Sequence, residues 1–280
     1  MSVTAGENWE FAGFKFHGLS LSGIRTAIAM PEHSLAFDVA QGYPFLLTLK
    51  NYFISHGHLD HAAGIPYILS QKAMTRQPRP RFFMPPSLVE PMTRIMNIWE
   101  EIEHHTYDYE FIGVKGDDKI SLSEKNFVRV FPTVHRIDSN GYTLFEIKKS
   151  LAPEFRNLPR EKLSEMAKSG IDLNQRDEIP LVSFTGDTQI EFLTSRPWVK
   201  KSKILITECT YLDDRKNAAS ARAWGHLHLD ELIPHLDEIE SEKIVLIHLS
   251  SRYSTKEALD ILDKRIPTAH RDRVIIFPGR

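Results

Sequence analysis

Three histidines and an aspartate fall within six consecutive residues, His56-Gly57-His58-Leu59-Asp60-His61. Imidazole nitrogens and carboxylate oxygens are the ligands that zinc and its first-row neighbours prefer. The group follows the apolar run 52–55 and precedes a helix-like segment, so we expect it at the end of a strand, where side chains can converge on one point. The spacing therefore predicts a metal site.

Three more polar residues each follow a hydrophobic run: His135, Asp187 and His248. Taken singly, a histidine in such a place is more often a hydrogen-bonded structural residue. Together with the four candidates of the hexapeptide they would give seven ligands. Two metal sites about 3.5 to 4 Å apart could hold a hydroxide and clamp both oxygens of a displacement at phosphorus or at a carbonyl carbon.

The order of these seven residues along the chain resembles that of the metallo-β-lactamase superfamily. Within it, segments 133–142, 185–188 and 246–253 resemble motifs of tRNase Z, the endonuclease that trims tRNA 3′ trailers. The resemblance spans nearly the whole chain. It implies an α/β fold, a four-layer αββα sandwich, in a single domain over residues 1–280.

The resemblance also implies a ligand set for two divalent metal ions. We expect Zn²⁺, with Mn²⁺ or iron as alternatives that the sequence leaves open. One ion would be held by His56, His58 and His135, the other by Asp60, His61 and His248, and Asp187 would bridge them. Asp60 would also orient the metal-bridging hydroxide or accept its proton.

Two further family motifs, His-Glu-Ala-Thr and Gly-His-Ser-Thr, assist departure of the leaving group. Here they read Thr-Glu-Cys-Thr over 207–210 and Gly-His-Leu-His over 225–228. A carboxylate that accepts from one imidazole nitrogen leaves the other nitrogen free to donate a proton. We therefore predict that His226 is the general acid and that Glu208 orients it. The alternative is that Glu208 is a surface residue and His226 a hydrogen bonder at a helix entry.

Contacts with substrate are predicted for Ser139, Arg252 and His228. Arg252 lies four residues beyond His248, and its planar guanidinium group could form two hydrogen bonds with a phosphate. His228 could contact substrate or replace either member of the acid pair. The basic groups at 76–81, 148–149 and 200–201 could contact phosphates, although most such groups are solvated surface.

Residues 143–186 occupy the place where a tRNase Z would carry a flexible arm that grips the tRNA elbow. We expect only a strand and a short helix over Arg160–Lys168 there, so the arm is predicted to be shortened or absent. Elsewhere we expect a helix over 62–73, a helix over 87–103 capped by Ser87 with Glu90 in a capping box, and a helix near 229–239.

Composition sets limits on the remaining classes of function. The chain has 280 residues and a net charge of −2, which gives no global attraction to nucleic acid. No window is long and apolar enough to cross a bilayer, so we expect a soluble, cytoplasmic protein without a membrane partner. Cys209 is the only cysteine, which excludes an internal disulfide. The family resemblance suggests a homodimer.

The preferred hypothesis is hydrolysis of a phosphodiester, with precursor tRNA as the RNA substrate and its 3′ end as the place of cleavage. A phosphodiesterase acting on a small cyclic nucleotide or nucleotide-like ester is the first alternative. A hydrolase of a carboxyl ester, lactone or thioester is the second. A non-catalytic RNA-binding protein is the least expected, because every predicted metal ligand is present.

Overall fold

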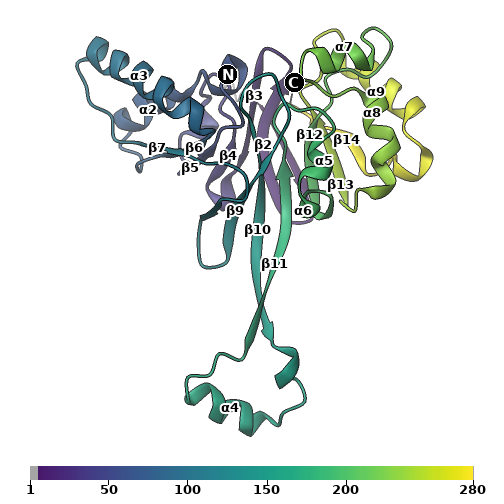
Figure 1. Ribbon diagram of the computed structural model, residues 1–280. Helices are drawn as coiled ribbons and strands as arrows, with labels where there is room; N and C mark the ends of the chain where they lie inside the picture. Colours follow the sequence, from purple (N-terminus) through teal and green to yellow (C-terminus); the bar gives the residue numbers. More distant parts are fainter. Residues whose placement is uncertain (1–5, 280) are drawn as a thin grey trace.

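Two seven-stranded sheets stacked face to face form the centre of the computed structural model, which describes residues 6–279 (Figure 1). The first sheet contains β1 (Glu7–Phe11), β2 (Phe14–Leu21), β3 (Arg25–Met30), β4 (Leu35–Phe37), β5 (Asn51–Phe53), β6 (Arg81–Met84) and β7 (Glu110–Gly113). The second contains β8 (Lys119–Ser121), β9 (Asn126–Pro132), β10 (Asn140–Leu151), β11 (Asn174–Phe184), β12 (Ile204–Glu208), β13 (Lys243–Ile247) and β14 (Val274–Ile276).

Both sheets change from antiparallel to parallel pairing halfway across. Strands β1 to β4 are antiparallel and β4 to β7 are parallel. Likewise β8 to β11 are antiparallel and β11 to β14 are parallel. In a parallel pair the carboxyl ends of the strands meet at one edge, which is where ligands bind in open α/β sheets.

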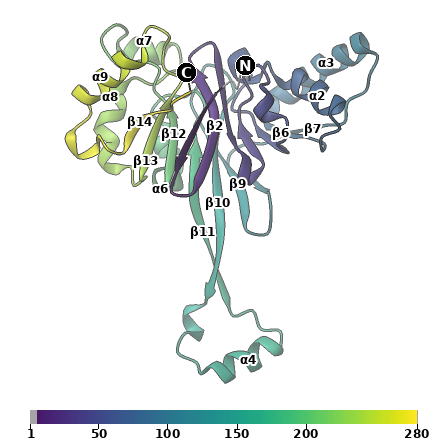
Figure 2. The same ribbon diagram turned by 180° about the vertical axis from the view of Figure 1, so that it is seen from behind.

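The described residues form nine α-helices, and all except the one between β10 and β11 lie over the outer faces of the two sheets (Figure 1). They are α1 (Leu59–Ala62), α2 (Ile65–Met74), α3 (Pro86–Glu103), α4 (Arg160–Lys168), α5 (Phe192–Ser195), α6 (Pro197–Lys201), α7 (Ala218–Ala223), α8 (Leu229–Leu232) and α9 (Thr255–Arg265). Short 3-10 helices are η1 (Pro31–His33), η2 (Pro44–Leu46), η3 (Pro153–Phe155), η4 (Ile233–Glu238) and η5 (Thr268–His270). Figures 1 and 2 show α2 and α3 on one flank of the sandwich and α7, α8 and α9 on the other.

The alternation of side chains along the strands explains the layers. Tyr52 and Phe82 pack outward against α2 and α3, whereas their neighbours Phe53 and Phe83 pack inward between the sheets. In the second sheet Leu205 packs outward against the helices, while residues 204 and 206 on either side of it face the first sheet. Because these strands are buried on both faces, their sequences are continuous apolar runs. The predicted αββα sandwich is confirmed.

Several predicted helices have different bounds or caps. The helix expected over 62–73 is two helices, α1 and α2, and the one expected over 229–239 is α8 followed by η4. Pro85 is the N-cap residue of α3, and no side chain caps this end. The Ser87 hydroxyl instead donates to the Asp138 carboxylate at 2.7 Å, and Glu90 pairs with Arg94. The predicted capping box is therefore wrong.

A two-stranded arm projects from the sandwich (Figures 1 and 2). Strands β10 and β11 pair from Tyr142 with Phe184 out to Leu151 with Asn174, and α4 lies at the tip. The side chains of β10 are buried up to Phe145 and emerge beyond it, next to a register shift between Leu144 and Phe145. Of the two predicted alternatives, an absent arm is wrong, because residues 146–178 build an arm rather than part of the body (Figure 1). A shortened arm stays a prediction.

Within residues 6–279, none of the helices combines the length and the apolar character needed to cross a membrane.

Candidate metal centre

The seven predicted metal ligands gather at the carboxyl ends of strands from both sheets. The first sheet supplies the hexapeptide 56–61, which follows β5 and enters α1. The second supplies His135 after β9, Asp187 after β11 and His248 after β13. Each of these apolar strands ends just before a predicted ligand. The ligand side chains therefore all lie at the same edge of the sandwich.

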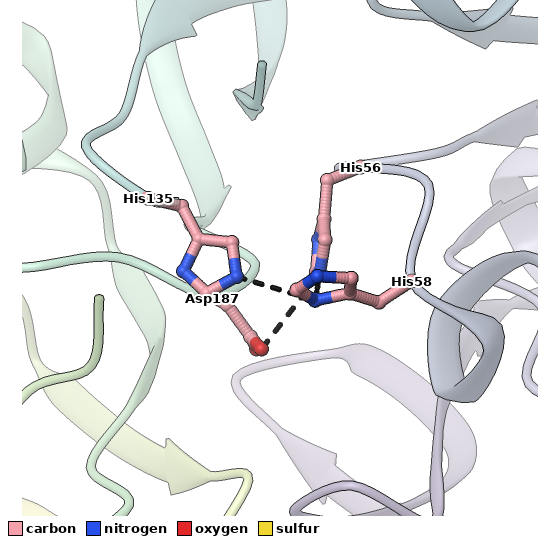
Figure 3. A group of neighbouring side chains, drawn as sticks. All are labelled: His56, His58, His135 and Asp187. Atoms are coloured by element: carbon pink, nitrogen blue, oxygen red, sulfur yellow. Dashed lines mark hydrogen bonds and ion pairs between the residues drawn. The ribbon is translucent and has the colours of Figure 1, made fainter. Parts of the chain in front are cut away.

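Three imidazoles and a carboxylate form the first group (Figure 3). The Nε2 atom of His56 lies 3.0 Å from Nδ1 of His58, and Nε2 of His135 lies 3.3 Å from the same Nδ1. Asp187 approaches with Oδ2 at 3.8 Å from Nε2 of His56. Ligand atoms on a tetrahedral zinc ion lie roughly 3.3 Å apart, given Zn–N bonds of about 2.0 to 2.1 Å. The first group therefore has the dimensions of a metal site.

Asp60, His61 and His248 form the second group, and Asp187 lies between the two. The Nε2 atom of His248 is 3.2 Å from Oδ2 of Asp60 and 3.4 Å from Oδ2 of Asp187. The other oxygen of Asp187, Oδ1, is 3.4 Å from Nε2 of His61. One carboxylate thus faces ligand nitrogens of both groups.

Buried atoms without hydrogen-bond partners indicate that a cation fits here. Nε2 of His61 and Oδ1 of Asp187 are both buried, and neither has a hydrogen-bond partner in the described part of the chain. A buried polar atom without a partner costs about 1 to 3 kcal/mol. A metal ion would satisfy both, and the donor set of imidazoles and carboxylates suits zinc and its neighbours.

Hydrogen bonds to the second ring nitrogen fix four of the five histidines. Nδ1 of His56 lies 3.0 Å from Ser55 Oγ, and Nδ1 of His61 lies 2.7 Å from Asp38 Oδ2. Nδ1 of His135 lies 2.8 Å from the carbonyl oxygen of Gly225. Nδ1 of His248 lies 3.1 Å from Thr210 Oγ1. Such bonds set the tautomer that leaves Nε2 free for a metal.

Burial and mutual charge shift the pKa values of the cluster. Burial lowers the pKa of His56 far below its ordinary value, and the neighbouring His61 adds to this. Burial also lowers the pKa of His58. Burial would lower the pKa of His61 too, but the carboxylates of Asp187 and Asp38 raise it well above the ordinary value. Burial opposes ionisation of Asp187, yet His248 and His61 hold its pKa far below the usual range.

Asp38 is a site residue for which the sequence predicted no role. It is fully buried after β4, with φ at 53°. Its Oδ1 accepts the Ser55 backbone N–H at 2.7 Å, and its Oδ2 accepts the Ser55 hydroxyl at 2.8 Å. The Ser55 hydroxyl in turn accepts from His56, while Asp38 holds His61 directly. One carboxylate therefore orients a ligand of each metal group.

The predicted acid pair is formed beside the cluster. Nδ1 of His226 lies 3.0 Å from Oε1 of Glu208, and the ring of His226 lies 5.3 Å from those of His135 and His248. Burial lowers the pKa of His226, but the charge of Glu208 and the hydrogen bond to it outweigh burial and raise the pKa to about 9. Glu208 is fully buried, so the alternative of a surface carboxylate is wrong.

Glu208 also connects the predicted acid, His226, to the predicted ligand His248 through Thr210. The Thr210 hydroxyl donates to Oε2 of Glu208 at 2.6 Å, and it accepts from Nδ1 of His248. The remaining lone pairs of the carboxylate accept the backbone N–H groups of Thr188 and Leu227. The arrangement parallels the Asp38–Ser55–His56 chain on the other side of the cluster.

The predicted substrate contacts have three different environments. Arg252 is exposed, in the loop after His248. Ser139 is buried, and its hydroxyl lies 2.7 Å from that of Thr133. His228 is completely buried as the N-cap residue of α8, where Nδ1 accepts from the Asp230 N–H and Nε2 lies 3.2 Å from the Asp213 carbonyl. With both ring nitrogens engaged, His228 is a structural residue, and we correct its predicted substrate contact.

We predict that Asp38→Asn weakens metal binding by roughly 10- to 100-fold, the usual effect of losing a hydrogen-bond partner of a ligand. The amide keeps the size of the carboxylate but cannot accept from His61 and Ser55 with a full charge. Competition with a chelator measures the affinity, and circular dichroism verifies folding. Asp108→Asn, at an exposed carboxylate paired with Arg79, is the control. Equal affinities in a folded Asp38→Asn protein would contradict the assigned role.

Comparison with known proteins identifies the family of the chain. The family described as "Beta-lactamase superfamily domain" matches residues 46–249. A tRNase Z of Arabidopsis thaliana is 28% identical over 260 residues, which cover 92% of this chain and 93% of that protein. The chloroplastic tRNase Z of the same plant is 30% identical over 250 residues, covering 89% of this chain and 71% of the relative.

Solved structures show the same fold. The short form of human tRNase Z superposes with a TM-score of 0.55 at 17% identity, covering 97% of this chain and 92% of that one. The metallo-β-lactamase fold protein YhfI of Bacillus subtilis gives a TM-score of 0.58 at 14% identity, covering 99% and 90% of the two chains. From the family match and the plant relatives, the chain belongs to the β-lactamase superfamily and, within it, to the tRNase Z family.

Proposed function

We propose that this protein is a metal-dependent endoribonuclease that removes 3′ extensions from precursor tRNA. The observation that carries the proposal is the seven-ligand cluster with the Glu208–His226 pair beside it, in a chain whose plant relatives bear the name tRNase Z. The single domain and the cytoplasmic location expected from the sequence stay predictions.

Two divalent cations, most simply Zn²⁺, would be held by the two ligand groups, with Asp187 between them. When bound, such ions supply a hydroxide nucleophile near neutral pH and neutralise charge that develops on the phosphate. Burial opposes ionisation of Asp60, yet hydrogen bonds from His248 and His61 hold its pKa far below the usual range. A carboxylate this weakly basic is suited to orienting the nucleophile rather than accepting its proton.

His226 supplies the proton for the leaving oxygen in this proposal. With a pKa raised to about 9, the imidazole is protonated at neutral pH. Glu208 occupies Nδ1, so Nε2 is the atom that faces away from the carboxylate and can donate. A thioester hydrolase has less use for such an acid, because a thiolate is a far weaker base than the alkoxide that leaves a phosphodiester.

The projecting arm supports a macromolecular substrate. A small diester would occupy only the metal cluster and would gain nothing from a hairpin that extends away from it. Lys148 and Lys149 are exposed on β10 and could contact a phosphate backbone. Basic and acidic side chains are equal in number between Glu146 and Glu178, so local placement rather than net charge would guide RNA.

An exposed apolar face on α2 and α3 supports the homodimer suggested by the family resemblance. Tyr67 and Trp99 line one hollow of about 400 Å³, and Trp99 also lines a neighbouring hollow of about 360 Å³ with Leu59 and Ile95. Leu59 is 77% exposed, and Ile98 and Ile102 on α3 are also exposed. A continuous apolar surface of this kind usually marks an interface. We propose a second copy of this chain as its occupant.

We expect metal-loaded protein to cleave a 3′-extended precursor tRNA, and Asp187→Ala to lose at least about 100-fold in kcat/KM, because the substitution removes a ligand shared by both groups. Asp263→Ala, at an exposed carboxylate on α9, is the matched control. Gel analysis of the RNA and parallel hydrolysis of bis(p-nitrophenyl) phosphate give the readouts. Near-normal turnover by Asp187→Ala would contradict the mechanism. Hydrolysis of the diester with intact precursor would reject tRNA as the substrate.

Replacing residues 152–173 by Asn-Gly should reduce cleavage of precursor tRNA about 100-fold relative to hydrolysis of the small diester, because one of two contact regions for the RNA is removed. The replacement is geometrically suitable, since Leu151 and Asn174 are paired and a two-residue turn can join them. The ratio of the two kcat/KM values is the measurement. An unchanged ratio would show that the arm does not hold the RNA.

Light scattering coupled to size exclusion should give twice the chain mass of 32.2 kDa. Ile98→Glu with Ile102→Glu should shift the protein to monomer, because two carboxylates would be buried at the interface without partners. Leu259→Glu, at a leucine that is 52% exposed on α9, should leave the dimer intact. A wild-type monomer, or a double variant that stays dimeric, would refute the proposed interface.

A further inference from the structure

An arginine and a tryptophan lie against each other at the rim of the metal cluster. The guanidinium carbon of Arg136 is 5.0 Å from the ring centre of Trp224. Arg136 follows the ligand His135 directly in the chain, and Trp224 precedes the acid His226 by two residues. Neither side chain has a role in the ligand groups or in the acid pair described above.

The position of this pair relative to the cluster is fixed by Gly225. Its carbonyl oxygen accepts from Nδ1 of His135, and its φ is 77°, a region that favours glycine. A Cβ at this position would lie 2.8 Å from His135 Nδ1 and 3.0 Å from the Arg136 side chain. The loop that carries Trp224 therefore packs directly against the loop that carries Arg136. This packing holds the pair at a fixed position next to the predicted metal ligands.

Arg136 is available to a ligand, unlike the arginines of comparable pairs. Arg129 lies over Trp198 and pairs with Asp117, and Arg215 lies over Tyr253 and pairs with Asp213. Among the described residues, the guanidinium of Arg136 forms no ion pair and no hydrogen bond, and it lies over the tryptophan ring. A pair that served only to stiffen the loop would not need five unused N–H donors facing solvent.

The exposed surface of the pair has the chemistry of a nucleotide site. Trp224 is 52% exposed, and Val134 and Ile137, which flank the His135–Arg136 step, are 43% and 40% exposed. Aromatic faces stack on the unpaired bases of single strands, whatever the base. A planar guanidinium binds a phosphate through two parallel hydrogen bonds.

We propose that Trp224 and Arg136 form a nucleotide subsite, in which Trp224 stacks on a base and Arg136 binds its phosphate. The subsite holds the nucleotide that carries the leaving oxygen, because that nucleotide must lie next to His226. This inference rests on the proposed phosphodiester hydrolysis, and it assigns to the substrate an unpaired nucleotide beside the bond that is cleaved.

The first test compares two precursor RNAs that differ at the nucleotide on the leaving-group side, which either carries its base or is abasic. Stacking on one aromatic side chain contributes roughly 5- to 150-fold to affinity. We expect wild-type protein to prefer the base-bearing RNA by about tenfold in kcat/KM, and Trp224→Ala to bring the ratio close to one. Trp224→Phe should restore most of the preference, and Lys264→Ala, at an exposed charge on α9, should not change it.

The second test needs no catalysis and uses adenosine 5′-monophosphate with the metal-loaded protein. The nucleotide should quench tryptophan fluorescence in the wild type, and the quenching should disappear in Trp224→Phe. It should bind more tightly than adenosine, and Arg136→Ala should remove that difference.

The two tests separate failure of the subsite from failure of the proposed function. A protein that cleaves RNA without any preference for the base, and whose quenching is the same in Trp224→Phe, would refute the subsite alone. A protein that shows Trp224-dependent quenching but hydrolyses no RNA would refute the endonuclease and retain the subsite.

Discussion

The buried carboxylate of Asp187 is the feature on which the arrangement of the site depends. Burying an ionised carboxylate costs several kcal/mol unless cations or hydrogen bonds compensate. Here the compensation comes from both sheets at once, since His61 belongs to the first half of the chain and His248 to the second. The two sheets must therefore stack in one relative position if His61 and His248 are both to reach Asp187 and stabilise its ionised form. The aromatic and aliphatic side chains packed between the sheets fix this relative position.

Two buried carboxylates on opposite sides of the cluster each hold a histidine through an intervening hydroxyl group. Asp38 orients His56 through the Ser55 hydroxyl, and Glu208 orients His248 through the Thr210 hydroxyl. Each carboxylate also binds a second imidazole directly, His61 or His226. The difference lies in what that second imidazole does. His61 lies among the predicted metal ligands, whereas His226 is predicted to be the acid, and Glu208 raises its pKa.

The sequence predicted the site better than the contacts that support it. The predicted metal ligands follow directly after apolar strands, so local pattern was enough to single out the hexapeptide, His135, Asp187 and His248, which the structure brings together. Asp38 acts on residues 17 and 23 positions away, and such contacts leave no local pattern. His228 illustrates the opposite error, since an imidazole with a helix-capping role looks like a second acid in the motif. The sequence left open whether the arm is shortened or absent, because its strands have few buried residues beyond Phe145 to reveal a paired ribbon.

Neither half of the chain can complete either metal group. The first group joins His56 and His58 to His135 and Asp187, and the second joins Asp60 and His61 to His248. A pair of bound ions would therefore be a removable cross-link between the two sheets, closed over long stretches of chain. Such a cross-link restricts the unfolded ensemble and stabilises only the stacked state. The same side chains that would cleave the substrate would thus also determine whether the two halves of the sandwich come apart together or separately.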